Sequence, residues 1–226
     1  VRNFQPMVGA FDIMDSGGAG VLVDELDNGD LVYVEGILPA LPGAFSRALL
    51  FEDDFVSRGL MVEVSDLEPF SSIELAASSY KQGPLTKPNL IRFPIGPGEH
   101  YLIENRSVDP DGDGGTAVFG ALDGRVVLYP TAFDDPDNEP TYEYDYLLPS
   151  FIKTDGSAVG GGILVWHVNE EIIYAEGSLL DDGSFWSNFE NNSVNTDFNR
   201  PGISVLEADG LRDLGEPYSG RKSTRL

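Results

Sequence analysis

Short apolar runs, separated by glycine, proline and polar residues, alternate along the whole chain, and long helical periodicity is absent. Runs of this length between turn residues are typical of β-strands. The strands predicted in this way are Leu60–Val64, Ser72–Ala77, Asn89–Phe93, His100–Glu104, Arg125–Tyr129, Gly162–Val168 and Ile203–Glu207. Many short strands with turns between them favour a mainly β fold of the β-sandwich kind.

Two local patterns add a hairpin and a helix to this picture. Val21–Leu26 and Leu31–Glu35 flank an Asn-Gly pair, which accepts the positive φ angles of a tight hairpin turn. Leu41–Leu50 carries an early proline and an apolar face, so we predict a short helix there. The long polar segments, predicted to be loops, are Val108–Gly115, Asp134–Glu139 and Ala175–Gly202.

The charge balance narrows the class of partner. The 226 residues include 38 acidic and 14 basic side chains, for a formal net charge of -24. Nucleic acid and anionic lipid both require clustered cations, so we expect neither as a partner, and no apolar run predicts membrane insertion. An acidic surface suits a salty exterior or calcium binding, although solvated acidic faces also serve solubility alone. The absence of cysteine excludes disulfides and is common in exported bacterial proteins.

Zinc is the first metal to consider, because His167 ends an apolar run and is followed by Asn-Glu-Glu. A catalytic zinc site needs about three protein ligands. The sequence has only two histidines, His100 and His167, and no HExxH motif. Each histidine falls in a predicted strand among apolar residues, so we expect both to pack within the sheet rather than to bind zinc.

Calcium fits the sequence better. Asp109, Asp111 and Asp113 alternate around a glycine turn, and this spacing can place several oxygens around one hard cation. The position where an EF-hand loop carries its bidentate glutamate is Gly120, which argues against an EF-hand. The remaining alternatives are a single calcium loop completed by a distant carboxylate such as Asp123, or a solvated acidic turn.

A second group of oxygen-bearing side chains follows two predicted strands. Asn169 and Glu170 end one strand, Glu207 and Asp209 end another, and Asn195 belongs to the polar loop between them. If the two strands are neighbours, these side chains could share one calcium ion. The alternative is ordinary capping of strand ends.

Three stretches resemble signatures of the immune inhibitor A family of secreted bacterial zinc metallopeptidases. Glu99–Arg106 resembles E-Y-x-L-x-E-N-R, Gly161–Glu170 resembles G-G-L-L-I-W-H-V-D-E, and Gly202–Gly210 resembles G-V-x-L-x-E-A-D-G. They occur in the order of that family. The resemblance implies a parent enzyme that hydrolyses peptide bonds in protein or peptide substrates with a zinc-activated water, and it raises the expectation of a structural calcium ion.

A fourth stretch, Val8–Gly18, resembles the G-x-W-x-I-M-x-x-G segment that follows the zinc helix in that family. The resemblance implies that Met14 is the methionine of a Met-turn beneath the zinc. It also implies a fragment that starts after the HExxH helix. We therefore expect residues 1–60 to be the short helical remnant of a metallopeptidase catalytic domain, with the Met-turn and the following helix, and residues 61–226 to form an acidic β-rich domain.

The sequence departs from the family at several positions. No residue matches the zinc ligands or the catalytic glutamate, so the chain alone is expected to be inactive. Phe11 stands in place of a tryptophan, and Asn169 stands in place of an aspartate. The alternative hypothesis is a non-enzymatic, calcium-stabilised β-sandwich that acts in adhesion or carbohydrate binding. Its contact residues would be Phe185, Trp186 and Phe189, although these three aromatic side chains could equally form a cluster that anchors their own loop.

Overall fold

The computed structural model describes Asp12 and residues 21–25, 28–35, 40–66, 68–69, 71–79, 87–107, 115–119, 126–130, 150–152, 158–197 and 199–206. Strands predominate among them, which confirms a mainly β fold. The strands are β1 (Val21–Glu25), β2 (Leu31–Glu35), β3 (Met61–Glu63), β4 (Leu90–Gly96), β5 (Glu99–Ser107), β6 (Gly115–Phe119), β7 (Val126–Pro130), β8 (Ser150–Ile152), β9 (Ala158–Asn169), β10 (Glu176–Leu179), β11 (Phe185–Ser187) and β12 (Ile203–Val205). The helices are α1 (Ala44–Ser57), α2 (Glu170–Ile173) and the 3-10 turn η2 (Val64–Asp66).

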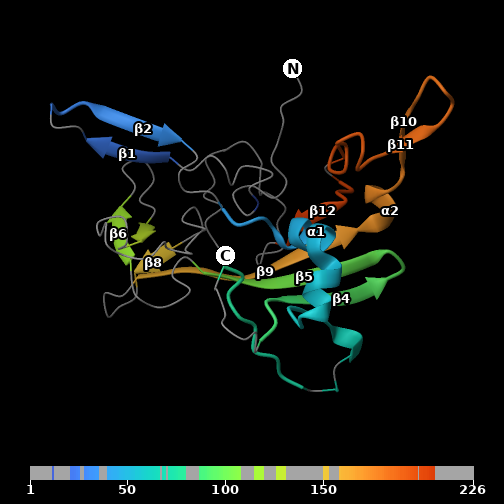
Figure 1. The fold of residues 1–226 in the computed structure, drawn as a ribbon, viewed down its shortest axis with the longest axis horizontal. Helices are drawn as coiled ribbons and strands as arrows, with labels where there is room; N and C mark the ends of the chain where they lie inside the picture. The colour runs from blue at the N-terminus through green and yellow to red at the C-terminus, as the bar shows by residue number, and fades with distance from the viewer. Residues whose placement is uncertain are drawn as a thin grey trace.

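The main sheet has the strand order β12-β9-β5-β4-β3, with β8 paired to the first residues of β9 (Figure 1). All neighbouring strands in it are antiparallel except β3 and β4, which are parallel. The long central ladder between β5 and β9 runs from Glu99 opposite Asn169 to Ser107 opposite Gly161. Separate two-stranded sheets are formed by β1–β2, β6–β7 and β10–β11.

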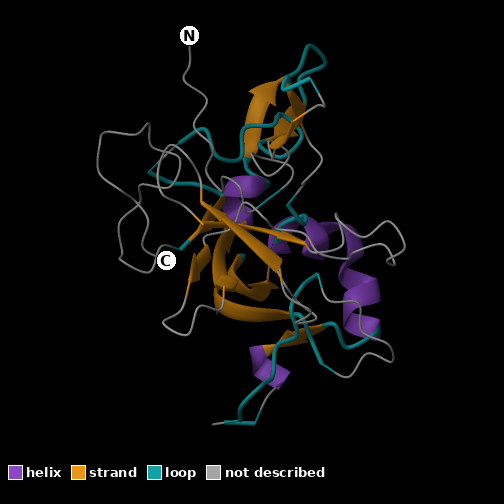
Figure 2. Ribbon diagram, turned by 90° about the vertical axis from the view of Figure 1, so that its left-hand side faces the viewer, coloured by secondary structure: helices purple, strands orange, loops and turns teal. Residues whose placement is uncertain are grey.

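Helix α1 covers one face of the main sheet (Figure 2). Its buried residues, Ala44, Arg47 and Ala48, follow the three- and four-residue spacing of one helix face. The small alanine side chains let the helix backbone approach the sheet closely. The backbone leaves helical geometry at Phe51 (φ −134°, ψ 22°), so the second half of α1 turns away from the axis of the first.

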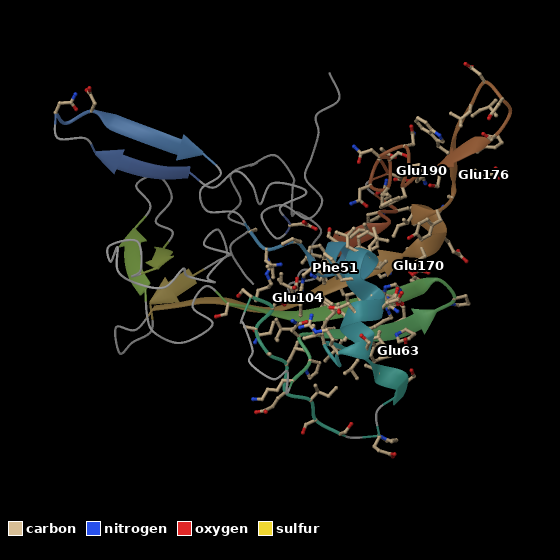
Figure 3. All side chains as sticks on the ribbon, in the orientation of Figure 1. Phe51, Glu63, Glu104, Glu170, Glu176 and Glu190 are labelled. Carbon is tan, nitrogen blue, oxygen red and sulfur yellow. The ribbon has the colours of Figure 1, made fainter. Side chains whose placement is uncertain are left out.

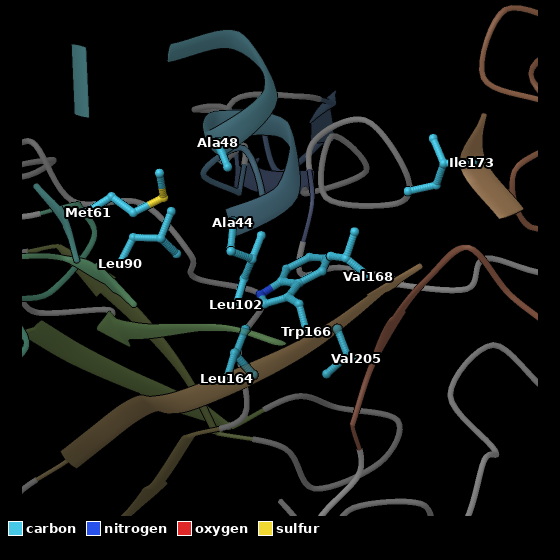
Figure 4. Packing of buried hydrophobic residues seen from close by; sticks show 10 residues of the cluster. All are labelled: Ala44, Ala48, Met61, Leu90, Leu102, Leu164, Trp166, Val168, Ile173 and Val205. Atoms are coloured by element: carbon cyan, nitrogen blue, oxygen red, sulfur yellow. The ribbon is translucent and has the colours of Figure 1, made fainter. Parts of the chain in front are cut away.

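The core lies between α1 and the sheet (Figure 4). Trp166 of β9 is completely buried at its centre, and Leu102 of the neighbouring strand is directly opposite it. The other buried apolar members are Ala44, Ala48, Met61, Leu90, Leu164, Val168, Ile173 and Val205. The sheet therefore gains most of its hydrophobic stabilisation on the α1 face, where these side chains are removed from water.

Two glycines permit close approaches around this core. A Cβ atom at Gly43, just before α1, would lie 2.5 Å from the Trp166 ring. A Cβ atom at Gly161 would lie 2.2 Å from the carbonyl oxygen of Arg106, and Gly161 also has a φ angle of 94°. Glycine at these two positions lets the helix start and strand β9 lie directly against their neighbours.

Most predicted elements are confirmed with changed bounds. Strands β1 and β2 pair as predicted, with Val21 opposite Glu35. The predicted strands near residues 60, 90, 100, 126, 162 and 203 correspond to β3, β4, β5, β7, β9 and β12. The predicted helix starts three residues later than expected, at Ala44, and continues to Ser57.

Other predictions differ from the structure. Ser72–Ala77 is not a strand: only Ala77 forms an isolated bridge, to Asn105. The predicted loop Ala175–Gly202 contains the hairpin β10–β11. Within the described residues, the main sheet packs against a helix rather than against a second sheet, so the mainly β class is confirmed and the sandwich arrangement is not seen there. Met14 lies outside the described residues, and the expected catalytic-domain remnant stays a prediction.

Candidate site: a buried polar cluster beneath helix α1

A cluster of charged side chains lies inside the protein, on the face of the sheet that packs against α1. Side chains alternate along β5, and the buried positions are His100, Leu102, Glu104 and Arg106. Glu104 and Arg106 therefore face α1, although both are ionisable. Burial of a charge is costly unless it is paired and hydrogen-bonded. The surroundings of Glu104 meet that condition.

Glu104, which is labelled in Figure 3, is completely buried. Both of its carboxylate oxygens accept hydrogen bonds from protein donors. Oε1 accepts the indole N–H of Trp166 at 2.8 Å and Nη1 of Arg106 at 3.2 Å. Oε2 accepts the hydroxyl of Ser78 at 3.0 Å and also Nη2 of Arg47. These donors come from β9, β5, the segment before β4, and α1, so Glu104 joins four parts of the chain.

The two arginines extend the cluster to the segment that enters α1. Arg47 donates from Nε to the carbonyl oxygen of Pro42 at 3.0 Å, and Arg106 donates from Nη2 to that of Leu41 at 3.1 Å. Arg47 also donates from Nη2 to the Ser78 hydroxyl at 3.0 Å. The planar guanidinium holds several acceptors in a fixed geometry, which suits this bridging role.

Ser78 is itself fixed to the sheet. Its backbone N–H donates to the carbonyl oxygen of Asn105 at 2.7 Å, and the side chain of Asn105 donates to the carbonyl oxygen of Leu75 at 3.2 Å. The segment from Leu75 to Ser78 therefore runs beside β5 at Asn105, one residue past the point where the first residue of β4 is opposite Glu104. It places the Ser78 hydroxyl beside Glu104.

Electrostatics keep Glu104 ionised. Burial alone raises its pKa, but Arg106, Arg47 and the hydrogen bonds from Trp166 and Ser78 together hold the pKa below the ordinary glutamate value of 4.5. One carboxylate and two guanidinium groups leave a formal surplus of one positive charge. Asp12, which is 5% exposed, is a further buried acidic side chain on the α1 side of the sheet.

Asp12 is a buried residue near the N-terminus that is bonded to helix α1. Its Oδ2 accepts the Ser46 hydroxyl of α1 at 2.8 Å. The same oxygen would lie 2.6 Å from a Cβ atom at Gly43, beside the Trp166 ring. Asp12 belongs to the Val8–Gly18 stretch, and it is the only residue of that stretch within the described part of the chain.

The cluster holds structural elements in place. All the acceptor sites of Glu104 are occupied by protein donors, and Arg47 and Arg106 are 6% and 1% exposed. A general acid, base or metal ligand needs a free site facing substrate or solvent. Glu104 has none, so the cluster fixes α1, β5 and β9 relative to one another rather than carrying out a reaction.

The two histidines lie on opposite faces of the sheet. Tyr101 is opposite His167 in the β5–β9 ladder, so His100, one residue earlier, points to the other face. His100 is buried on the α1 face, and burial, followed by the nearby Arg92, lowers the pKa of its imidazole. Both side chains pack in the sheet, as expected, and they cannot share a metal ion.

His167 belongs to a polar row on the face away from α1. Its Nε2 lies 2.7 Å from Oε1 of Glu99, and the same oxygen accepts the Asn169 side-chain amide at 3.3 Å. The ring of Tyr101 packs against the imidazole, with centroids 5.6 Å apart. The Glu99 contact orients His167, and this acceptor was not anticipated from the sequence.

The described calcium candidates have other partners. Oδ1 of Asn169 caps α2 by accepting the backbone N–H of Ile172, and Oδ1 of Asn195 accepts that of Ile203. Oε1 of Glu170 lies 3.9 Å from Nδ1 of His100. These are the contacts of strand-end and helix-end capping, the alternative raised by the sequence.

The strands that precede this group are neighbours, but they are antiparallel. Leu206 donates its backbone N–H to Val165, so the chain leaves β12 at the end remote from Asn169. The other candidates lie outside the described residues: Asp109, Asp111, Asp113, Asp123, Glu207 and Asp209. The calcium sites stay predictions. Among the described residues, no group of three or more His, Asp or Glu side chains is arranged around a metal position.

Comparison with known protein families, curated proteins and solved structures finds no match. Within the described residues, no helix has both the length and the apolar character needed to cross a membrane.

Proposed function

We propose that the chain is the structural, non-catalytic part of an exported zinc metallopeptidase of the immune inhibitor A kind. In this proposal the chain holds the wall of a substrate cleft and does not bind zinc itself. The observation that carries the proposal is the Glu104 cluster. Two stretches that resemble the family in sequence, although far apart along the chain, supply three of its side chains: Glu104, Arg106 and Trp166.

The correspondence is specific. Glu104 and Arg106 are the last charged residues of the stretch Glu99–Arg106, and Trp166 lies in Gly161–Glu170. They meet within hydrogen-bonding distance in the core. Residues 203–205 of the third stretch pair with β9 beside Trp166. A coincidental similarity of short segments gives no reason for these residues to contact one another, whereas a shared fold does.

Asp12 gives the cluster a role within this proposal. Residues 8–18 would carry the Met-turn, and Asp12 is bonded to Ser46 of α1 while Arg47 of the same helix turn is bonded to Glu104. The cluster would thus fix the Met-turn segment against the sheet. Met14 would then form part of the floor of the cleft.

Among the residues that the structure describes, no group of histidine and carboxylate side chains fits a zinc site. Both histidines of the sequence are packed on opposite sheet faces, and cysteine is absent. Zinc and the water it activates would be held by residues outside this sequence. We therefore derive no catalytic step from the side chains described above.

The alternative of a non-enzymatic adhesion or carbohydrate-binding module is favoured by one observation. Phe185, Trp186 and Phe189 are each more than 40% exposed, as a contact surface requires. The two functions are distinguished by the coding sequence on the N-terminal side of Val1. An HExxH helix there supports the peptidase, and a further β module supports adhesion.

An activity assay tests the proposal on the protein itself. The purified chain, supplied with zinc and casein, is expected to show no turnover above the rate without protein. Chelator-sensitive hydrolysis that copurifies with the chain would contradict the structural role. Absence of an HExxH motif from the complete coding sequence would contradict membership of a zinc peptidase.

A further inference from the structure

The hairpin β10–β11 and its base expose an unusual concentration of large apolar side chains. Leu179 is 66% exposed, Phe185 48% and Trp186 45%. At the base of the hairpin, Tyr174 is 51% exposed and Phe189 43%. The hairpin projects beyond the end of the main sheet at the upper right of Figure 1. Exposed apolar groups gathered in this way mark interaction sites in soluble proteins.

Apolar side chains cover both faces of this two-stranded ribbon. Leu179 and Phe185 are directly opposite one another, so their side chains share one face. Trp186 follows Phe185 in the strand and points to the other face. The rings of Tyr174 and Phe189 contact each other at the base, with centroids 6.2 Å apart. A binding partner can therefore make apolar contacts with either face of the hairpin.

The base of the hairpin is fixed to the core. Asn188 donates its side-chain amide to the carbonyl oxygen of Ile172 at 2.8 Å and its backbone N–H to Ala175 at 2.9 Å. Phe189 donates its backbone N–H to Ile173, which is completely buried. A surface held in place before binding loses little conformational entropy when a partner docks.

The segment that forms the hairpin and its base carries charge of one sign. Between Val168 and Arg200 the sequence has seven acidic residues and neither lysine nor arginine. The acidic residues are Glu170, Glu171, Glu176, Asp181, Asp182, Glu190 and Asp197. Hydrogen bonds from Ser184 lower the pKa of Asp182, and those from Ser187 lower the pKa of Glu190, so both stay ionised in mildly acidic solution. The apolar patch is thus accompanied by negative charges from its own segment of the chain.

We propose that the β10–β11 hairpin docks a basic protein segment in which arginine or lysine side chains alternate with apolar ones. Arginine pairs with carboxylates and stacks on aromatic rings, and this surface offers both. A second copy of the chain would bring a further net charge of -24, and an anionic membrane is repelled for the same reason. The inference stands apart from the proposed peptidase role and is tested separately.

Helix α1 provides a contrasting surface. It exposes Leu50 (68%) and Phe51 (52%), but it also carries Arg58, and its Glu52 is paired with Arg92. It therefore combines exposed apolar groups with mixed charge. Its exposed side chains are matched controls for those of the hairpin.

Titration calorimetry with a synthetic peptide of alternating arginine and leucine tests the proposal. The peptide is expected to bind the full chain with an affinity that falls as salt rises. A peptide with glutamate in place of arginine is expected not to bind. Leu179→Ser is expected to weaken binding about tenfold, the effect of a contact residue at the centre of an interface. Leu50→Ser is expected to leave the affinity unchanged.

A second pair of substitutions measures how much the acidic side chains of the hairpin contribute to peptide binding. Asp181→Asn at the tip of the hairpin is expected to weaken binding, and Asp53→Asn on α1 removes the same charge at an exposed site without that effect. Equal weakening by both substitutions would overturn the proposal, since the peptide would then respond to net charge alone. Failure of the peptide to bind, or equal binding of the glutamate peptide, would also overturn it. So would binding of a neutral polysaccharide in place of the peptide.

Tryptophan fluorescence provides a second readout on the unaltered protein, independent of whether a variant folds. Trp186 is 45% exposed and Trp166 is fully buried, so acrylamide quenching reports mainly on Trp186. Saturating arginine–leucine peptide is expected to protect Trp186 from the quencher. Binding without protection would place the peptide elsewhere and overturn the proposal.

Discussion

Replacement of Glu104 by glutamine removes the charge from the cluster while keeping the shape of the side chain. The glutamine amide NH2 must face one of two donor pairs, either Trp166 with Arg106 or Ser78 with Arg47. Two acceptor bonds are lost, each worth about 1.5–3 kcal/mol when a charged group takes part. The sum agrees with the roughly 3–5 kcal/mol lost when one partner of a buried ion pair is removed.

Urea denaturation followed by the fluorescence of buried Trp166 and by circular dichroism measures this loss. We expect Glu104→Gln to lower the free energy of unfolding by about 4 kcal/mol, a large part of the roughly 5–15 kcal/mol of a typical domain. The matched control is Glu74→Gln, because Glu74 pairs with Lys87 at the surface and its side chain is 79% exposed. The control is expected to leave the urea midpoint unchanged.

The outcome that refutes the reasoning is a Glu104→Gln variant whose urea midpoint equals that of the wild type or of the control. Such a result would mean that the two guanidinium groups find other acceptors without cost. If the variant does not fold, Trp166→Phe provides a milder test, because it removes a single donor from Glu104. A destabilisation no larger than that of the lost ring volume would contradict the cluster.

Three further predictions follow from the same geometry. The pKa of Glu104 in the folded protein lies below its unfolded value near 4.5. The stabilisation that the ionised Glu104 gives to the fold is therefore complete above pH 4.5 and is lost as the pH falls through the folded-state pKa. When the free energy of unfolding is measured against pH, the wild type should show this acid-dependent loss and Glu104→Gln should not. Gly161→Ala should lower the free energy of unfolding by more than the ~1 kcal/mol expected for an alanine in the left-handed region, because its Cβ would also collide with the backbone of Arg106. The control is Gly59→Ala, where φ is 69° and no atom lies within 4 Å of the added Cβ. Urea unfolding of the control should show only the smaller loss. If the acidic loops hold calcium, the melting temperature should rise with calcium and fall with chelator, and equal values in calorimetry would contradict both calcium sites.

The predictable part of the fold is the part with regular alternation. Strand β5 was recognised from His100 to Glu104, but it continues to Ser107. If buried strand positions are assumed to be apolar, the charged residues Glu104 and Arg106 are predicted to lie beyond the end of the buried face. They are buried nevertheless, because each neutralises the other and because Trp166 and Ser78 complete their hydrogen bonds. Pairwise compensation of this kind depends on distant residues, so no local pattern reveals it.

The missed hairpin has a different cause. Strand β10 contains Gly177 and Ser178, which have low strand propensity, and it is held by its pairing with β11, where Glu176 is opposite Ser187 and Leu179 is opposite Phe185. One local signal was present: Asp182-Gly183 between Leu179 and Phe185 is a hairpin-turn pair between apolar residues. Helix α2 likewise had a signal, since Asn169 followed by two glutamates is a favourable helix start. Their surroundings of glycine, serine and asparagine concealed both.

The composition of the cluster indicates why a charged core is retained at all. An apolar replacement of similar volume is often as stable as a buried ion pair, so stability alone does not explain Glu104, Arg47 and Arg106. Apolar contacts, however, tolerate sliding of one element over another, whereas a carboxylate with four fixed donors accepts a single arrangement. Arg47 and Arg106 donate to the carbonyl oxygens of Pro42 and Leu41 and so fix the start of α1 relative to Glu104. Ser46 of the same helix donates to Asp12 and so fixes the position of Asp12. The cluster therefore fixes Asp12 and the start of α1 relative to the sheet, which is a property that the proposed cleft wall would require and an apolar core provides poorly.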